Sequence, residues 1–306
     1  MNASPALRFD WFITRDGLRI RYAAARSFTA DPSALVVLLH GRAEFIEKYV
    51  SIIRQFQKMG FDVATLDWRG QGLSDRELAN RHKGYVKDFD SYISDLRVLF
   101  DRDINPNRLP VVFVAHSMGG HIGLRFIKEY PGLVQKAVLI SPMIDILTGP
   151  FPGTLARQIA KIACRFGFAE RYVIGGKDYV PEKIRFETNL FTHDREKFLV
   201  HFRAVEQNPD LALGDVTWGW LHAAFRSIER LTDPAYASGV TIPVLMLCAL
   251  EDRVVDVEAQ KRFAGMAPGC SFVPIEQGYH ELLFETRKIR QKVWQYMAAH
   301  LKGSDS

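Results

Sequence analysis

Residues 111–120 read Val111-Val-Phe-Val-Ala-His-Ser-Met-Gly-Gly120, a continuous apolar run that leads into small residues around a serine. This pattern predicts a buried strand that enters a helix through a sharp turn, with Ser117 at the junction. A serine hydroxyl becomes a useful nucleophile only where it is exposed, close to a base and aimed at a carbonyl, and such a turn provides the exposure. Ser117 is therefore a candidate nucleophile, although a simple helix N-cap after a buried strand has a similar pattern.

Apolar runs and helical periodicities alternate on both sides of this segment. The expected strands cover residues 9–15, 18–24, 34–40, 63–66, 111–115, 137–140, 244–250 and 271–275, and the expected helices cover 46–59, 89–100, 117–130, 257–266 and 281–301. The first two strands are separated by Asp16-Gly17, which predicts a β-hairpin. The later alternation predicts parallel strands joined by right-handed crossovers. We therefore expect an α/β fold with a mostly parallel eight-stranded sheet flanked by helices. Residues 34–40 should lie mid-sheet because the run is apolar throughout.

The alternation of strands and helices stops between Pro142 and Ser238. A structureless loop of this length would be unusual in a compact domain, so we predict a helical cap inserted at residues 142–238, between core parts at 1–141 and 239–306. Two groups in the cap have helical spacing, and each either packs on the core, which is favoured, or faces lipid. They are Leu155, Ile159, Ile162 and Phe166, with Arg157, Lys161 and Arg165 interleaved, and Trp218, Trp220, Leu221 and Phe225.

A carboxylate and a histidine follow the serine in the order that such a strand-to-helix nucleophile requires. Asp252 comes directly after a buried-strand run, and His280 lies on a loop before the last helix. The carboxyl ends of parallel strands meet at one edge of the sheet, so both side chains can reach the serine. Either residue alone would be interpreted as a cap, turn or core residue. Glu251 and Asp256 are lesser candidates for the acid.

Acyl transfer also needs hydrogen-bond donors aimed at the oxyanion that develops in the transition state. Met118, immediately after the candidate nucleophile, is expected to supply one backbone N–H group. The loop His40-Gly-Arg-Ala-Glu44 is expected to supply the other through the backbone of Arg42, because Gly41 lets the chain turn close to the serine. A simple strand-ending turn is the alternative for this loop.

Composition and charge exclude several classes of function. The 306 residues carry 40 Lys and Arg against 35 Asp and Glu, a net charge of +5 that is too small and too scattered to indicate a nucleic-acid partner. It does suit an anionic membrane surface or phosphate headgroups. The three cysteines, Cys164, Cys248 and Cys270, are widely spaced, which indicates neither a disulfide framework nor a zinc site and favours a reducing cytoplasm.

Motifs for membrane insertion, metals and cofactors are missing from the sequence. The first ten residues lack a secretory signal, and no apolar run is long enough to span a bilayer, so we expect a soluble, cytoplasmic protein that is at most peripheral to a membrane. The partial match Gly70-x-Gly72 does not complete a dinucleotide motif. No His-Glu-x-x-His spacing supports a catalytic metal, so we expect no cofactor. The oligomeric state is left open.

The strongest motifs together resemble the α/β-hydrolase family, most closely its lysophospholipase L2 and monoacylglycerol lipase branch. The motifs that carry this resemblance are His40-Gly41 with Glu44, Ala115-His-Ser-Met-Gly119, and Asp252 with His280. The block Asp67-Trp-Arg-Gly-Gln-Gly-Leu-Ser74 also looks like that family's Asp-x-Arg-Gly-x-Gly-x-Ser turn, in which Asp67 and Arg69 are expected to be structural. Ala115 departs from the usual Gly-x-Ser-x-Gly pattern, and a methyl group should be tolerated there.

The resemblance implies that Ser117 is the nucleophile, that Asp252 and His280 are its partners, and that the N–H groups of Arg42 and Met118 form the oxyanion hole. It also implies an amphipathic single-chain ester as substrate, such as a lysophospholipid or a monoacylglycerol. Arg42 departs from the small residue often found there, so its side chain is expected to narrow the mouth of the site or to meet a headgroup. A short-chain carboxylesterase and a non-catalytic ligand-binding protein are the alternatives.

Overall fold

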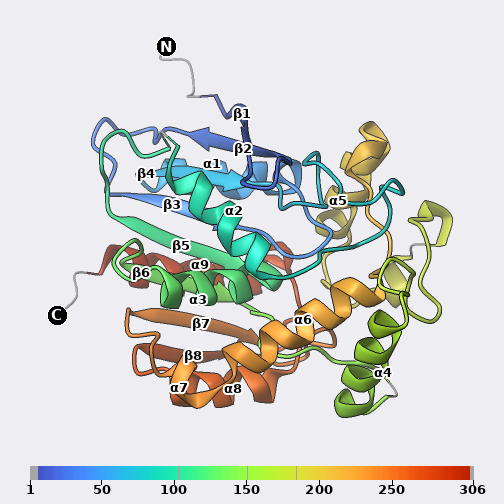
Figure 1. Ribbon diagram of the computed structural model, residues 1–306. Helices are drawn as coiled ribbons and strands as arrows, with labels where there is room; N and C mark the ends of the chain where they lie inside the picture. Colours follow the sequence, from blue (N-terminus) through green and yellow to red (C-terminus); the bar gives the residue numbers. More distant parts are fainter. Residues whose placement is uncertain (1–5, 103, 150, 184, 304–306) are drawn as a thin grey trace.

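The computed structural model describes residues 6–102, 104–149, 151–183 and 185–303. Its centre is an eight-stranded sheet in the order β1-β2-β4-β3-β5-β6-β7-β8 (Figure 1). The strands are β1 (Arg8–Ile13), β2 (Arg19–Ala25), β3 (Ala34–Leu39), β4 (Phe61–Leu66), β5 (Val111–His116), β6 (Lys136–Ile140), β7 (Val244–Ala249) and β8 (Cys270–Ile275). β2 pairs antiparallel with β1 and β4, and every other pairing is parallel. The expected fold, the hairpin and the mid-sheet position of β3 are confirmed.

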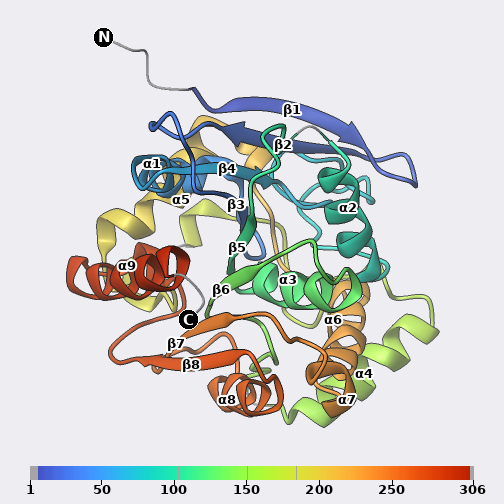
Figure 2. The same ribbon diagram turned by 90° about the vertical axis from the view of Figure 1, so that its left-hand side faces the viewer.

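Helices cover both faces of this sheet, as Figure 2 shows. One face carries α1 (Val50–Lys58) and α9 (Arg287–Lys302), and the other carries α2 (Asp90–Phe100), α3 (Met118–Glu129) and α8 (Val257–Met266). The side chains of β3 alternate between the two cores, with Leu35, Val37 and Leu39 in one and Val36 and Leu38 in the other. This two-sided burial explains why the strand is apolar throughout.

Two of the expected helices, 46–59 and 281–301, each begin with a short 3₁₀ turn in the structure. The first starts as a 3₁₀ turn, η1 (Ile46–Tyr49), and continues as α1. The last is divided into η5 (Leu282–Phe284) and α9, because Glu285 between them is extended. The buried carboxylate of Glu285 accepts hydrogen bonds from the backbone N–H groups of Tyr279 (3.0 Å) and Thr286 (2.8 Å), which holds the chain out of helical conformation there.

The stretch between β6 and β7 is helical, and none of its described residues forms a strand of the sheet. Its elements are α4 (Gly153–Arg165), η2 (Pro181–Lys183), η3 (Phe186–Thr188), α5 (Arg195–Gln207), η4 (Pro209–Leu211), α6 (Trp218–Leu231) and α7 (Pro234–Ala237). α6 contributes Trp220, Ala224 and Leu231 to the core that contains α3, whereas α4 and α5 lie at the side of the molecule (Figure 1). The division of the chain at residues 142 and 238 stays a prediction.

The apolar side chains of α4 are not packed as the sequence pattern favoured. Leu155, Ile162 and Phe166 are 42%, 55% and 71% exposed, while Ala160 faces α6 and is buried. A helix of this length needs only a narrow face to pack on its neighbour, and here a small residue supplies that face. The packing interpretation was wrong for these three residues. It was right for Trp220 and Phe225, which are both buried.

Candidate active site

Ser117 lies on the sharp turn between β5 and α3. Its φ of 51° and ψ of −118° belong to a region that residues other than glycine rarely adopt. The backbone is held on both sides, because the N–H of Ser117 donates to the carbonyl oxygen of Ile140 (3.0 Å) and its own carbonyl accepts from the N–H of Met143 (3.0 Å). The turn therefore presents the hydroxyl at the end of the strand, as expected of a nucleophile.

Small residues around the serine make this turn possible. A Cβ atom at Gly119 would collide with the carbonyl oxygens of Leu39 and His40, the latter at 2.6 Å, so only glycine lets α3 approach β3 this closely. Ala115 is accommodated because it faces Gly123 of α3, where an added Cβ would lie 3.8 Å from the Ala115 methyl carbon. An alanine in place of the usual glycine at position 115 therefore fits without a clash.

Ser117, His280 and Asp252 form a hydrogen-bonded chain. The Ser117 hydroxyl donates to Nε2 of His280 at 2.9 Å, and Nδ1 of His280 donates to Oδ2 of Asp252 at 2.6 Å. All three residues are buried, at 7%, 3% and 9% exposure. The three loops that carry them follow β5, β8 and β7, so the parallel sheet brings together residues that are distant in sequence.

Asp252 is held in place by its own loop. Its Oδ1 accepts the backbone N–H groups of Val254 (2.8 Å) and Val255 (3.1 Å), which leaves Oδ2 for the imidazole. The two lesser candidates for the acid lie elsewhere. Glu251 is exposed, and Asp256 caps the N-terminus of α8 by accepting the N–H of Ala259 at 3.0 Å.

The loop after β3 lies directly against the nucleophile. A Cβ atom at Gly41 would be 3.1 Å from Cβ of Ser117, so glycine is needed for this approach. None of the hydrogen bonds found within the described part of the chain uses the backbone N–H of Arg42 or Met118. Two such donors beside an oriented serine hydroxyl have the chemistry of an oxyanion hole. The structure therefore brings together all five predicted site residues.

A buried ionic cluster around Glu44 lies next to the predicted site residues. The Glu44 carboxylate accepts from the N–H of Gly41 (2.5 Å), Nζ of Lys48 (2.7 Å), the hydroxyl of Tyr49 (2.8 Å) and Nδ1 of His116 (3.0 Å). Nε2 of His116 lies 3.3 Å from the carbonyl oxygen of His280. The cluster thus connects the loop that carries the N–H of Arg42, the strand that leads to Ser117 and the loop that carries His280.

The charges in this cluster stabilise one another. Burial opposes ionisation of Glu44, but Lys48 and His116 hold the pKa of its carboxyl well below the usual value. Burial likewise opposes the charge on His116, yet the neighbouring Glu44 raises the pKa of the imidazole above its usual value. A protonated His116 donates from both ring nitrogens, to Glu44 and to the carbonyl of His280.

The sequence interpretation did not assign His116, Lys48 or Tyr49 to the site. One signal was present, since Glu44 and Lys48 are four residues apart, the spacing at which opposite charges pair on a helix, and they form an ion pair at 2.7 Å. His116 had a signal as well, because it is a titratable residue at the end of a buried strand next to the nucleophile.

The block 67–74 has the structural role expected of it, although its two charged residues do not pair with each other. The Asp67 carboxylate accepts the backbone N–H groups of Ile46 and Leu73, both at 2.9 Å. Arg69 instead forms two hydrogen bonds of 2.7 Å to the buried carboxylate of Asp95. Both residues therefore fix loops beside the site without facing the serine.

Comparison with known proteins identifies the family of this chain. A family model described as serine aminopeptidase, S33, matches residues 30–287. The chain belongs to this family. It is 32% identical over 285 residues to lysophospholipase L2 of Escherichia coli (strain K12), covering 90% of this chain and 82% of that protein. It is 33% identical over 290 residues to a monoacylglycerol lipase of Mycolicibacterium smegmatis, covering 93% and 95%. The resemblance stated from the motifs is confirmed.

The fold of this S33-family protein also matches solved structures. A soluble variant of monoglyceride lipase from Saccharomyces cerevisiae, in complex with a substrate analog, superimposes with a TM-score of 0.77 at 18% identity, covering 99% of this chain and 96% of that one. A thermostable carboxyl esterase from Bacillus coagulans gives 0.78 at 17% identity. At such identities the likeness concerns the fold alone.

Ser117 opens on an apolar cavity of about 440 Å³, called here the serine cavity. It lies between the ends of the strands and the helices of residues 142–238, and its lining includes Met143, Ile146, Trp218, Trp220 and Leu221. Arg42 is the charged residue among those described in this lining. The cavity therefore suits an apolar chain whose reactive group lies at the serine.

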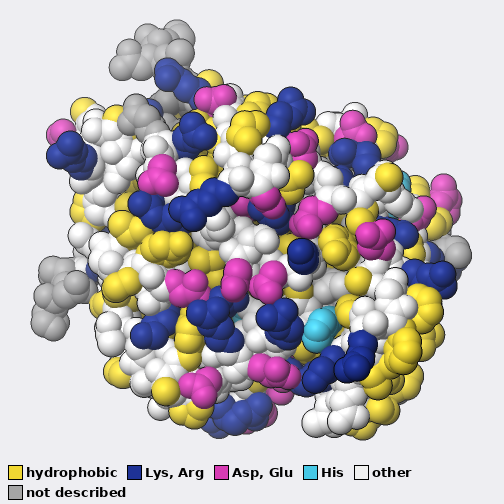
Figure 3. Space-filling view, in the orientation of Figure 1, with side chains coloured by type: hydrophobic (Ala, Val, Ile, Leu, Met, Phe, Trp, Pro, Cys, Tyr) yellow, Lys and Arg dark blue, Asp and Glu magenta, His cyan; other side chains and the backbone are white. Residues whose placement is uncertain are grey.

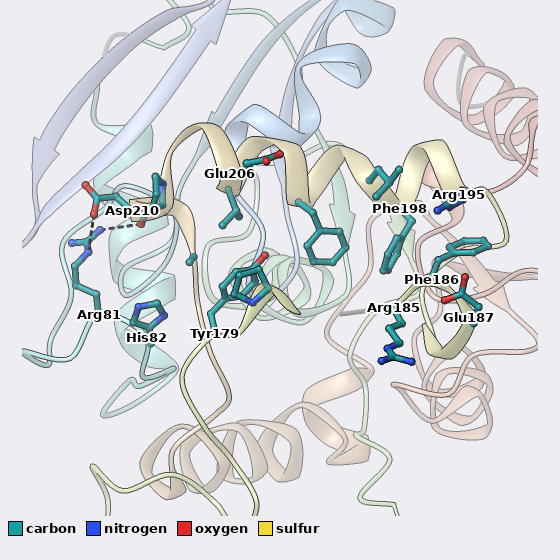
Figure 4. A pocket seen from close by; sticks show the side chains of 16 residues that line it. Arg81, His82, Tyr179, Arg185, Phe186, Glu187, Arg195, Phe198, Glu206 and Asp210 are labelled. Atoms are coloured by element: carbon teal, nitrogen blue, oxygen red, sulfur yellow. Dashed lines mark hydrogen bonds and ion pairs between the residues drawn. The ribbon is translucent and has the colours of Figure 1, made fainter. Parts of the chain in front are cut away.

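Two further cavities lie in the same part of the molecule. A charged cavity of about 410 Å³ shares Arg42 with the serine cavity, and its wall includes Lys48, Lys177, Asp215 and Glu281. An outer cavity of about 810 Å³ shares Tyr179, Arg185, Phe198 and Phe202 with the charged cavity. Figure 4 shows α5 along the outer cavity, with Arg81 bonded to Asp210 at one end and Phe186 and Arg195 at the other. The outer cavity is thus larger than the serine cavity.

The described ranges give no sign of a metal centre or of a membrane-spanning helix. No group of three or more His, Cys, Asp or Glu side chains in them is arranged to hold a metal ion. None of the helices described there is long and apolar enough to cross a membrane.

Proposed function

We propose that this protein hydrolyses carboxylic esters of single-chain amphipathic lipids, lysophospholipids or monoacylglycerols, through an acyl-enzyme on Ser117. The observation that carries the proposal is the hydrogen-bonded chain from Ser117 through His280 to Asp252 at the mouth of an apolar cavity. The names of the E. coli and M. smegmatis relatives support lipid esters as the substrate class.

The chemistry follows from the positions of the atoms. Nε2 of His280 takes the proton of the Ser117 hydroxyl while the serine oxygen attacks the ester carbonyl. Asp252 orients the imidazole and stabilises its charged form, and the N–H groups of Arg42 and Met118 bind the oxyanion. The imidazolium then protonates the departing alcohol, and the same histidine activates the water that releases the fatty acid.

The serine cavity favours an ester over the peptide substrates that the family description suggests. An aminopeptidase needs a carboxylate to bind the amino group of its substrate, because a buried cation is costly unless it is paired. The described lining of the serine cavity contains no Asp or Glu, and its one charged side chain, Arg42, would repel an ammonium group. An acyl chain, in contrast, gains free energy from the same apolar wall.

We further propose that residues 142–238 act as a cap that contacts a membrane surface through α4 and the segment after it. Side chains of this region are exposed and apolar: Leu155, Ile162, Phe166, Phe168 and Ile174, with Ile174 82% exposed. Figure 3 shows hydrophobic side chains along the lower right edge, where Figure 1 places α4. Leu147, Phe151 and Ile174 are exposed and also line the serine cavity, so the apolar surface is continuous with its mouth.

The decisive experiment is a rate profile across acyl lengths, measured with and without a phosphate headgroup. The proposal expects kcat/KM to rise from acetyl to medium and long acyl esters, because each methylene buried in the cavity contributes roughly 0.8 kcal/mol. Peptide amides serve as the reference for the aminopeptidase activity. A preference for acetyl esters or for amides would contradict the proposal.

A further inference from the structure

Arg42 lies at the boundary between the apolar and the charged cavity. This residue lines both cavities, and among their described lining residues it is the one that they share. One terminal nitrogen donates to the carbonyl oxygen of Gly214 at 2.5 Å, and the guanidinium lies 5.7 Å from the ring centroid of Trp220. Nε of Arg42 is buried and has no hydrogen-bond partner among the described residues. The guanidinium is thus anchored at one end and has donors left over.

The charge of Arg42 has no carboxylate in contact. No acidic oxygen within the described ranges lies within 4.0 Å of its guanidinium, although ion pairs are frequent elsewhere in the chain. Asp215 is near enough to act electrostatically, but it is exposed to solvent and accepts the backbone N–H of Lys177. Burial lowers the pKa of Arg42 from its usual value, while Asp215 raises it.

The other basic residues around the charged cavity are paired, uncharged or exposed to solvent. Lys48 is buried between Glu44 and Glu281, with both ion pairs at 2.7 Å. Burial lowers the pKa of His201 to about 3, so this histidine is uncharged at neutral pH. Lys177 and Arg185 are exposed, where water screens them. Arg42 is therefore the cation in this wall that is both partly buried and available to an anion.

The position of Arg42 decides which part of the substrate it meets. Its backbone N–H has no hydrogen-bond partner among the described residues and belongs to the lining of the serine cavity beside Ser117, while a terminal nitrogen of its side chain bonds to Gly214 in the wall of the charged cavity. An acyl chain in the serine cavity leaves the alcohol part of the ester on the side of that charged cavity. In a lysophospholipid the alcohol carries a phosphate, a planar guanidinium binds phosphate oxygens well, and a monoacylglycerol has only hydroxyl groups there.

We propose that the Arg42 side chain binds the phosphate of the substrate headgroup in the charged cavity and so makes the enzyme selective for lysophospholipids over monoacylglycerols. This rests on the proposed function of Ser117 and narrows its substrate class. Arg42 would thereby have two roles: its backbone N–H binds the oxyanion, and its side chain selects the leaving group.

The test compares wild type, Arg42→Gln and Arg42→Lys on lysophosphatidylglycerol and monoacylglycerol with the same acyl chain, in the same neutral detergent. Arg42→Gln should lower the ratio of kcat/KM for the phospholipid to kcat/KM for the glyceride by roughly 10- to 100-fold, the range for a hydrogen bond to a charged group. Arg42→Lys keeps the positive charge and should retain part of the ratio. The matched control is Arg54→Gln, an exposed arginine on α1, which should leave the ratio at the wild-type value.

Two outcomes would overturn the proposal. Equal losses on both lipids in Arg42→Gln would show that the side chain only holds the Gly214 segment, and no loss on either would show that it binds nothing. If that variant does not fold, inhibition of the wild type decides the matter: glycerophosphoglycerol should compete with substrate, and glycerol at the same concentration should not. Equal inhibition by both would refute a phosphate site. The two proposals fail in different ways. If the proposed function is wrong, the wild type hydrolyses neither lipid, whatever its activity on a p-nitrophenyl ester. If only the Arg42 proposal is wrong, the wild type hydrolyses lipids but Arg42→Gln leaves the ratio between them unchanged.

Discussion

Ser117 combines a strained backbone with a fully partnered side chain. A φ of 51° is unfavourable for a residue with a Cβ atom, and the surrounding backbone hydrogen bonds to Ile140 and Met143 keep it in place. Because the backbone is held by these bonds and not by the hydroxyl, removing the hydroxyl should leave the turn intact. The chemistry and the structure of this residue can therefore be tested separately.

Ser117→Ala should lower kcat by at least about a thousandfold with little change in the unfolding midpoint, because it removes the attacking oxygen but none of the backbone hydrogen bonds that hold the turn. The measurement is turnover of a medium-chain ester together with urea unfolding. Ser51→Ala, an exposed serine on α1, is the control and should behave as wild type. Substantial esterase activity in the Ser117 variant would remove this residue from the mechanism.

Asp252→Asn should lower kcat roughly a thousandfold or more, because an amide in place of Oδ2 no longer holds the imidazole in the tautomer that accepts the serine proton. Asp256→Asn is the matched control on the same loop. Asp256 caps α8, so its substitution should cost at most about 1 kcal/mol of unfolding free energy and leave turnover near the wild-type value. Equal effects of the two substitutions on turnover would argue against a special role for Asp252.

Two glycines of α3 should differ in how well they tolerate an added Cβ atom. Gly119→Ala places a Cβ against the backbone oxygens of Leu39 and His40, which cannot give way, so we expect a loss of about 1–3 kcal/mol in unfolding free energy and most of the activity. Gly123→Ala meets only side-chain carbons of Leu39 and Phe113 at 3.4 Å and should change stability by less than about 1 kcal/mol. Urea unfolding of both variants checks this difference, and similar losses would contradict it.

The ionic cluster below the site predicts a pH dependence of stability. The folded-state pKa of His116 is raised, so its contribution is fully present below its unfolded pKa of about 6.5 and is lost as pH rises through the folded value. His116→Gln should therefore lower the unfolding free energy more at about pH 6 than at about pH 9. Chemical unfolding of the wild type and the variant at both pH values measures this. A constant difference would mean that folding does not raise the pKa of His116.

How far the sequence predicts these elements depends on the kind of signal. The strands, the hairpin and the order of Ser117, Asp252 and His280 were predictable, because apolar runs and chain order reflect local sequence. The cluster around Glu44 was not predicted, since the burial of a charged residue depends on partners that only the folded chain brings together. The same limit applies to α4, whose helical spacing defines an apolar face but not what covers it.

At the scale of the whole molecule, the site residues and the cavity walls come from different regions of the chain. Ser117, Asp252 and His280 follow the carboxyl ends of β5, β7 and β8, and the segment between β6 and β7 supplies much of the cavity wall and of the exposed apolar surface. A lipid ester buried in an aggregate must leave it to reach Ser117. If the proposed membrane contact is made through the apolar surface at the mouth of the serine cavity, the acyl chain does not have to cross bulk water during that transfer.

The double variant Ile162→Ser, Phe166→Ser should therefore bind more weakly to vesicles of phosphatidylglycerol and phosphatidylethanolamine. Each of these side chains is more than half exposed in the protein alone, and burying one in the interface contributes roughly 1.5–3 kcal/mol, so the pair should reduce partitioning at least about tenfold. Vesicle cosedimentation measures this. The double variant Phe9→Ser, Ile13→Ser on β1 removes exposed apolar side chains from a distant part of the molecule and should bind as wild type. If both double variants lose binding equally, the contact is not made by α4, and the exposed face of this helix has another role.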